Sequence, residues 1–157
     1  MGSYAFLTTW CFQDAAIADA FELLRDSAGY PRWWKSVIAT ERLEQGDAEG
    51  VGELTRFQWR GALPYLLSFD LRVSRLERPY LIEGRASGEL DGIGLWRLYE
   101  GQGLAVVYEW RVRTTKGWMN LAGPLARPAF AWNHDLVMRE GARGFAGALG
   151  AALIVHD

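Results

Sequence analysis

The segment WNHDLVMREGARGF, residues 132 to 145, decides the fold. At about 100° per residue, a helical wheel places one polar residue, His134, in the middle of an apolar stripe. The stripe consists of Phe130, His134, Val137, Met138, Gly141, Phe145, Ala148 and Leu149. Because Asp135, Arg139 and Arg143 lie on the opposite face, the segment is predicted to be a long amphipathic helix that buries a histidine.

Glycines interrupt the apolar stripe of this helix. Gly141 and Gly144 supply no side chain, although glycine in a helix interior costs about 1 kcal/mol relative to alanine. We interpret the missing side chains as space beside His134. The sequence therefore predicts a cavity against this helix, without naming a ligand.

Short alternating runs of apolar and polar residues precede the helix and predict strands. The first alternates through Tyr4, Phe6, Thr8, Trp10 and Phe12. The others are placed at residues 36–44, 51–60, 65–76, 80–88, 92–100 and 104–115. Because the connections are too short for helical crossovers, the sheet should be antiparallel, with one face covered.

Helical signals separate the first strand from the second. Asp14 is a predicted N-cap, and apolar residues at helical spacing follow it until Gly29, which predicts a helix over residues 15–27. The segment YPRWW, residues 30–34, predicts a turn or a second short helix.

Alternation also assigns the inner face of the sheet, which is rich in aromatic residues. These are Phe57, Trp59, Phe69, Trp96, Tyr108 and Trp110. Each of them either packs in the core or stacks on a planar ligand. Gly84, Ala86 and Gly94 share this face and predict further space.

This order of elements, with GIGLWRLYEGQGLAVVYEWRVR at residues 92–113 and WNHDLVMREGARGF at residues 132–145, resembles the START-like, polyketide cyclase and lipid-transfer superfamily, also called SRPBCC. The resemblance implies an α+β helix-grip fold in a single domain, residues 1–157. In that fold a curved seven-stranded antiparallel sheet wraps around a long C-terminal helix, with one or two short helices after the first strand. It implies a cavity more strongly than it implies a reaction.

Composition excludes several classes of function. The chain has 157 residues, and its 17 Lys and Arg against 19 Asp and Glu leave no basic footprint for nucleic acid. No apolar segment is long enough to span a membrane. Cys11 has no partner for an internal disulfide, and the opening MGSYAFLTTW has no leader pattern, so we expect a cytoplasmic protein. His156 is the only other histidine, so we expect no metal and no cofactor.

His134 is the candidate for chemistry, with three alternatives: contact with a polar group of a ligand, a structural hydrogen bond, or catalysis as an acid or base. Asn133 and Glu140 flank the stripe and either face solvent, hold His134 or reach the cavity rim. The predicted ligand-contacting residues are His134, Tyr108, Trp110, Phe57, Trp59, Trp96, Phe69, Phe130, Val137 and Gly141.

The segments on either side of the final helix have open roles. Residues 116–128 are predicted to connect the last strand to the helix. Their apolar residues, Trp118 and Met119 among them, either gate the cavity, touch a membrane from which a lipid is loaded, or plug the end of the sheet. The apolar tail, residues 147–157, either continues the helix or forms a subunit contact in a homodimer.

The leading hypothesis is a carrier that binds a small hydrophobic molecule, lipid-like or planar and polyketide-like, in the cavity. The resemblance to polyketide cyclases implies a rival, an aromatase or cyclase that uses His134 as acid or base. A third hypothesis is a protein-interaction module with a vestigial cavity, which predicts a filled interior and an exposed apolar patch.

Overall fold

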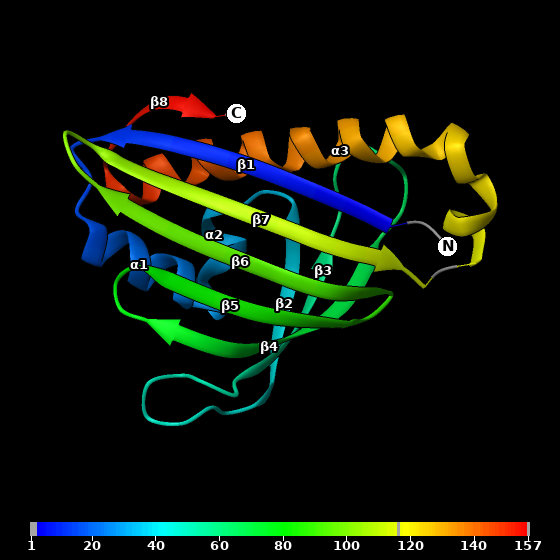
Figure 1. Ribbon diagram of the computed structural model, residues 1–157, viewed down its shortest axis with the longest axis horizontal. Coiled ribbons are helices and arrows are strands. Elements are labelled where there is room, and N and C mark those ends of the chain that lie inside the picture. Colours follow the sequence, from blue (N-terminus) through cyan, green and yellow to red (C-terminus); the bar gives the residue numbers. More distant parts are fainter. Residues whose placement is uncertain (1–2, 116, 157) are drawn as a thin grey trace.

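One antiparallel sheet of eight strands forms the body of the molecule, in the order β2-β3-β4-β5-β6-β7-β1-β8 (Figure 1). This computed structural model describes residues 3–115 and 117–156, with residues 117–126 and 155–156 described by their backbone alone. The strands are β1 Ser3–Gln13, β2 Val37–Glu44, β3 Leu54–Trp59, β4 Leu67–Glu77, β5 Leu81–Gly88, β6 Leu90–Glu100, β7 Leu104–Thr114 and β8 Ala152–His156.

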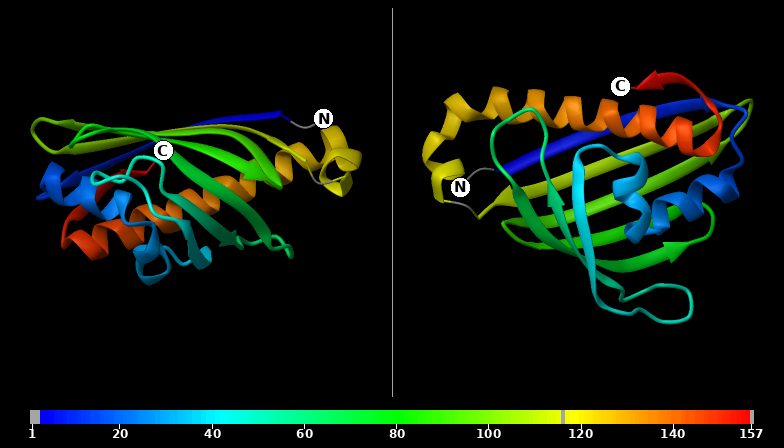
Figure 2. Two further views of the ribbon diagram at one scale, coloured as in Figure 1. Left: turned by 90° about the horizontal axis from the view of Figure 1, so that it is seen from below. Right: turned by 180° about the vertical axis from the view of Figure 1, so that it is seen from behind.

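The helices all lie on one face of the sheet, and the long C-terminal helix runs along that face (Figure 2). They are α1 Ile17–Arg25, the 3-10 turn η1 Ser27–Gly29, α2 Tyr30–Trp33 and α3 Gly117–Leu149. The predicted cap of the first helix is wrong, because α1 begins after Ala16. Asp14 instead takes a left-handed conformation, with φ of 59°, where the chain turns out of β1.

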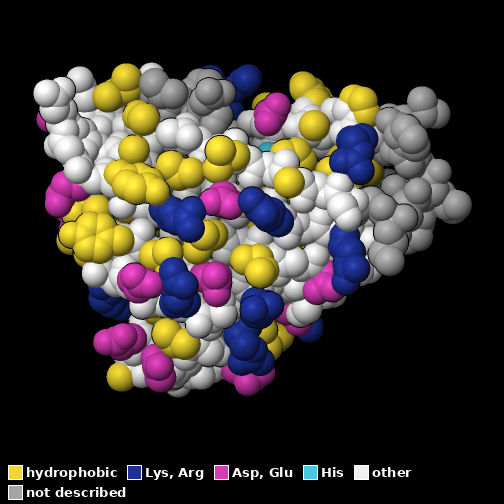
Figure 3. All heavy atoms as spheres, viewed as in Figure 1, with side chains coloured by type: hydrophobic (Ala, Val, Ile, Leu, Met, Phe, Trp, Pro, Cys, Tyr) yellow, Lys and Arg dark blue, Asp and Glu magenta, His cyan; other side chains and the backbone are white. Residues whose placement is uncertain are grey.

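The predicted inner face is confirmed by the alternation of burial along the strands. Trp10, Phe57, Trp96 and Trp110 are buried. Their neighbours along each strand face outward, and charged side chains are scattered over this outer face (Figure 3). Arginine and carboxylate pairs between neighbouring strands, such as Arg56 with Asp70 at 2.8 Å, stabilise such exposed positions only slightly.

The structure corrects the sequence prediction at both ends of α3. Residues 117–128, predicted as a connection, are already helix, and the first part of the helix bends away from the rest (Figure 1). Pro124 and Pro128 explain the error: a proline removes one N–H donor and bends a helix without having to end it. After Gly150, whose φ is 67°, the tail reverses and forms β8.

Strand β8 is an eighth strand, which neither expectation for the tail included. It pairs antiparallel with β1, where Phe12 lies opposite Leu153 and Gln13 opposite Ala152. The turn at Gly150 brings the short run ALIVH beside the free edge of β1. There it pairs with the backbone N–H and C=O groups of that edge, which requires only a few residues in extended conformation.

The space predicted at four glycines is filled, and that prediction is wrong for Gly84 and Gly94 in the sheet and for Gly141 and Gly144 in α3. A Cβ at Gly141 would lie 2.5 Å from the Trp34 ring, and one at Gly144 would lie 1.6 Å from the Trp33 carbonyl oxygen. In the sheet, a Cβ at Gly84 would meet the Leu71 side chain at 2.9 Å. These glycines therefore allow neighbouring groups to approach closely.

Trp34 anchors the filled end of the interior. Its indole Nε1 donates a hydrogen bond to the Val137 carbonyl at 2.9 Å. Its ring lies 5.7 Å from that of Trp10, which in turn lies 5.7 Å from Phe145. The space beside α3 lies next to Phe130 and His134, as the sequence predicted for His134, but it does not reach Gly141.

Candidate functional site

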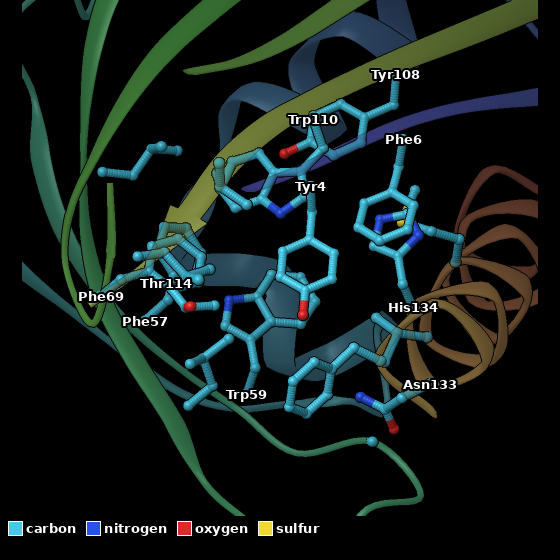
Figure 4. Close-up of a pocket in the computed structure, with 18 of the residues that line it drawn as sticks. Tyr4, Phe6, Phe57, Trp59, Phe69, Tyr108, Trp110, Thr114, Asn133 and His134 are labelled. Carbon is cyan, nitrogen blue, oxygen red and sulfur yellow. The ribbon is translucent and has the colours of Figure 1, made fainter. Parts of the chain in front are cut away.

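A cavity of about 150 Å³ lies between the inner face of the sheet and α3. Figure 4 shows its walls: Tyr4 and Phe6 come from β1, Tyr108 and Trp110 from β7, and Asn133 and His134 from α3. Strands β3, β4 and β6 and the segment between β3 and β4 add Phe57, Trp59, Gly61, Tyr65, Leu67, Phe69, Leu71, Leu90 and Trp96. Tyr30 of α2, Trp34 directly after that helix, Val112 and Thr114 of β7, and Phe130, Val137 and Met138 of α3 complete the described wall.

The structure brings together most of the residues that the sequence singled out as ligand contacts. The cavity is lined by His134, Tyr108, Trp110, Phe57, Trp59, Trp96, Phe69, Phe130 and Val137. Gly141 does not line it, because Trp34 covers that part of α3. Trp118 and Met119, the predicted gate, lie in the first turn of α3, and their side chains are outside the described residues.

His134 lies flat against Phe6 at the cavity wall. The two ring centroids are 3.9 Å apart and the planes differ by 11°. Its Nδ1 atom is buried and has no hydrogen-bond partner among the described residues. Burial lowers the pKa of His134 from 6.5 to about 4, so the imidazole is neutral at pH 7 and can offer one donor and one acceptor.

Two other side chains add polar atoms to the apolar wall. Trp59 has a buried Nε1 with no partner among the described residues. The Tyr4 hydroxyl points away from β1 into the space among Trp59, Asn133 and His134 (Figure 4). A ligand in this space could accept a hydrogen bond from an indole N–H and exchange one with a histidine.

Tyr108 belongs to an aromatic stack on the inner face. Its ring centroid lies 4.0 Å from that of Trp96, with 29° between the planes. Burial, and next the neighbouring Tyr30, raise the pKa of the Tyr108 hydroxyl well above its usual range. The phenol therefore stays protonated at any physiological pH and can only act through hydrogen bonds and stacking.

Asn133 fastens the segment between β3 and β4 over the cavity. Its Oδ1 accepts hydrogen bonds from the backbone N–H of Ala62 at 2.8 Å and of Leu63 at 3.2 Å. A Cβ at Gly61 would lie 2.3 Å from the same oxygen. Of the alternatives for Asn133, the structure selects the cavity rim. Glu140 does not hold His134 but accepts a hydrogen bond from Ser36 at 2.8 Å.

Several wall residues were not among the predicted contacts, chiefly Tyr4, Phe6, Tyr65 and Gly61. Alternation in β1 already placed Tyr4 and Phe6 on the inner face, so their position in the cavity wall could have been predicted from the sequence. Gly61 and Tyr65 lie between strands, and no periodicity shows what such a segment covers.

The described wall carries no formal charge. Among the residues whose side chains the structure describes, no lysine, arginine, aspartate or glutamate lines the cavity, and the polar ones that do are tyrosines, tryptophans, Thr114, Asn133 and His134. Within the described residues no cluster of three or more His, Cys, Asp or Glu side chains could hold a metal ion. Among the same residues, no helix is long and apolar enough to cross a membrane.

Comparison with known proteins identifies the fold. The chain is 18% identical to the ZhuI aromatase/cyclase from a Streptomyces species, over 95% of this chain and 94% of that one, with a TM-score of 0.72. It is 17% identical to the di-domain ARO/CYC protein BexL, with a TM-score of 0.72 over 94% of this chain. A START superfamily protein from Mycobacterium smegmatis is 10% identical, over 94% of this chain and 97% of that one, with a TM-score of 0.69.

The similarity is one of architecture. No protein-family model matches the chain, and no curated protein sequence matches it. The chain spans 50% of the length of BexL. At these identities the matches establish the helix-grip fold alone, the fold that the sequence resemblance implied. They do not identify a ligand or a reaction.

Proposed function

We propose that this protein binds a small planar hydrophobic molecule in the cavity between the sheet and α3. The observation that carries the proposal is an uncharged aromatic cavity of about 150 Å³ in which buried polar atoms of His134 and Trp59 have no partner among the described residues. Apolar burial supplies the affinity, at about 25 cal/mol per Å², and the polar atoms orient the ligand.

The size of the cavity supports a ligand of one or two rings. Pockets for drug-sized ligands occupy about 300–1,000 Å³, and an engineered apolar cavity of about 150 Å³ in another protein binds benzene. The volume here is about 150 Å³. Stacked aromatic side chains suit a flat molecule better than a long acyl chain, so lipid transport is not the function that we favour.

A second candidate function is that of an aromatase or cyclase, which the structural similarity to ZhuI and BexL supports. His134 would serve as the acid or base. Its pKa of about 4 makes it a weak base at neutral pH, and no carboxylate or arginine lines the described wall to assist it. A poly-ketone chain that folds back on itself also needs more room than this cavity offers, so we rank binding above catalysis.

The interaction-module hypothesis is weakened by the same observations. A vestigial cavity should be filled, whereas this one has volume and buried polar atoms without partners among the described residues. The homodimer contact through the tail loses its main support as well, because β8 packs on β1 of its own chain.

A cavity-blocking variant tests the proposed function. Val137 lines the cavity from α3, and Val137→Phe should place a ring in the space. In calorimetric titration with naphthalene, we expect the unmodified protein to bind and Val137→Phe to lose binding at least tenfold. The matched control is Leu7→Phe on β1, because Leu7 is 68% exposed on the outer face. Equal binding by all three proteins would refute the cavity as the site.

A further inference from the structure

The cavity wall also restricts the charge of its ligand. We propose that the cavity selects an uncharged aromatic alcohol over the corresponding carboxylate, with His134 as the residue that recognises the hydroxyl. This inference rests on the proposed function, since it names the ligand class for the same site. It is carried by the lining residues, by the orientation of His134 and by the partners of Asn133.

The described wall offers no counter-ion for a carboxylate. A carboxylate that leaves water needs a cation or several donors to replace its hydration. The described residues that line the cavity include no lysine and no arginine. Arg127 lies next to the wall residue Tyr4, but its guanidinium lies over the Tyr4 ring, 4.7 Å from the centroid, and donates to the Ser3 carbonyl at 2.8 Å.

Asn133 and His134, the polar residues that α3 adds to the wall, do not compensate for the missing charge. Asn133 could in principle bind a carboxylate through its amide group, but its Nδ2 lies 3.5 Å from the Tyr65 hydroxyl and its Oδ1 holds the backbone of Ala62 and Leu63. His134 is neutral near pH 7, because burial holds its pKa at about 4. An anion would therefore meet no positive charge in the described wall, and the single unpartnered N–H of Trp59 cannot replace the hydration of a carboxylate.

His134 presents a polar atom to the cavity that has no partner among the described residues. Stacking on Phe6 fixes the plane of the imidazole, and Nδ1 is buried without a partner among the described residues. Whether Nδ1 carries the proton or the lone pair, a hydroxyl can satisfy it, because a hydroxyl both donates and accepts. A carboxylate can only accept, and it adds a buried charge.

A set of three probes tests this selection: naphthalene, a naphthol and the naphthoate with its substituent at the same ring position. At pH 7 we expect the naphthol to bind at least tenfold more tightly than the naphthoate and more tightly than naphthalene, by calorimetric titration. In His134→Phe, which keeps the stack on Phe6, we expect naphthalene affinity to be preserved and naphthol affinity to fall about threefold to tenfold, the range of one hydrogen bond.

The control is Trp132→Phe, because Trp132 is 56% exposed on the same helix. It should bind all three probes like the unmodified protein. If naphthalene binds but the naphthoate binds as tightly as the naphthol, the selection for a neutral ligand is wrong while the proposed function stands. A naphthol preference that survives His134→Phe would refute the role of His134, and failure of naphthalene to bind would refute the proposed function itself.

Discussion

At the scale of single residues, His134 makes stability depend on pH. Its pKa is near 6.5 when exposed and about 4 in the folded protein, because burial disfavours the charged imidazolium. Between these values the unfolded chain binds a proton that the folded protein does not. The free energy of unfolding should therefore decrease as the pH falls from about 6.5 to about 4, by roughly 3 kcal/mol from this residue.

Urea unfolding at several pH values checks this expectation, with His134→Phe as the reference that lacks the titrating group. The stability difference between the two proteins should be constant above pH 7 and should shift against the histidine protein as the pH falls below 6. A difference that does not change between pH 7 and pH 4 would show that the imidazole is solvated like an exposed one.

Asn133 is the second residue whose role can be tested by itself. Asn133→Ala removes the acceptor for the N–H groups of Ala62 and Leu63, so the segment between β3 and β4 should loosen. We expect a loss of stability of about 1–3 kcal/mol and faster amide hydrogen exchange at Ala62 and Leu63. Asp135→Ala is the matched control, because Asp135 is exposed on the same helix. Unchanged exchange at both amides would contradict the role given to Asn133.

At the scale of elements, two glycines of α3 should respond in opposite directions to the same substitution. A Cβ at Gly141 would lie 2.5 Å from the Trp34 ring, so Gly141→Ala should destabilise the protein by about 1–3 kcal/mol. A Cβ at Gly147 would meet nothing within 4 Å, so Gly147→Ala should stabilise the helix by up to about 1 kcal/mol. Denaturant unfolding of both variants measures this, and stabilisation by Gly141→Ala would mean that Trp34 does not pack there.

The elements also show what the sequence could and could not predict. Alternation located β1 to β7 to within a few residues, because a half-buried strand imposes a period of two on its own residues. The start of α3 was missed because two prolines suggested a connection. Strand β8 was missed because its pairing depends on the free edge of β1, which no local pattern reveals.

The sheet residues of the candidate site could be predicted from alternation, as the strands themselves were. Residues on the inner face, such as Tyr108 and Trp110, follow from alternation, so their place in the wall could be expected. The space beside His134 was also predicted, but its extent along α3 was not, because Trp33 and Trp34 close the gaps at Gly144 and Gly141. A glycine in a helix indicates a close approach as readily as a hollow.

At the scale of the whole molecule, the fold divides its interior into a filled part and an open part. Trp34, Trp10 and Phe145 pack together in the filled part. The open part lies between Phe6, Trp59 and His134 (Figure 4). A ligand that enters the open part stabilises the folded state by mass action, so saturating naphthol should raise the midpoint of thermal unfolding of the unmodified protein more than that of Val137→Phe.

The most direct test of the account is to locate a bound aromatic molecule by nuclear magnetic resonance. With naphthalene present, we expect intermolecular Overhauser effects from its protons to the methyl groups of Val137 and Met138 and to the indole of Trp59, all of which line the cavity. Overhauser effects confined to exposed side chains such as Leu7 and Ile38, with none to these three residues, would contradict the claim that the space between sheet and helix is a binding site.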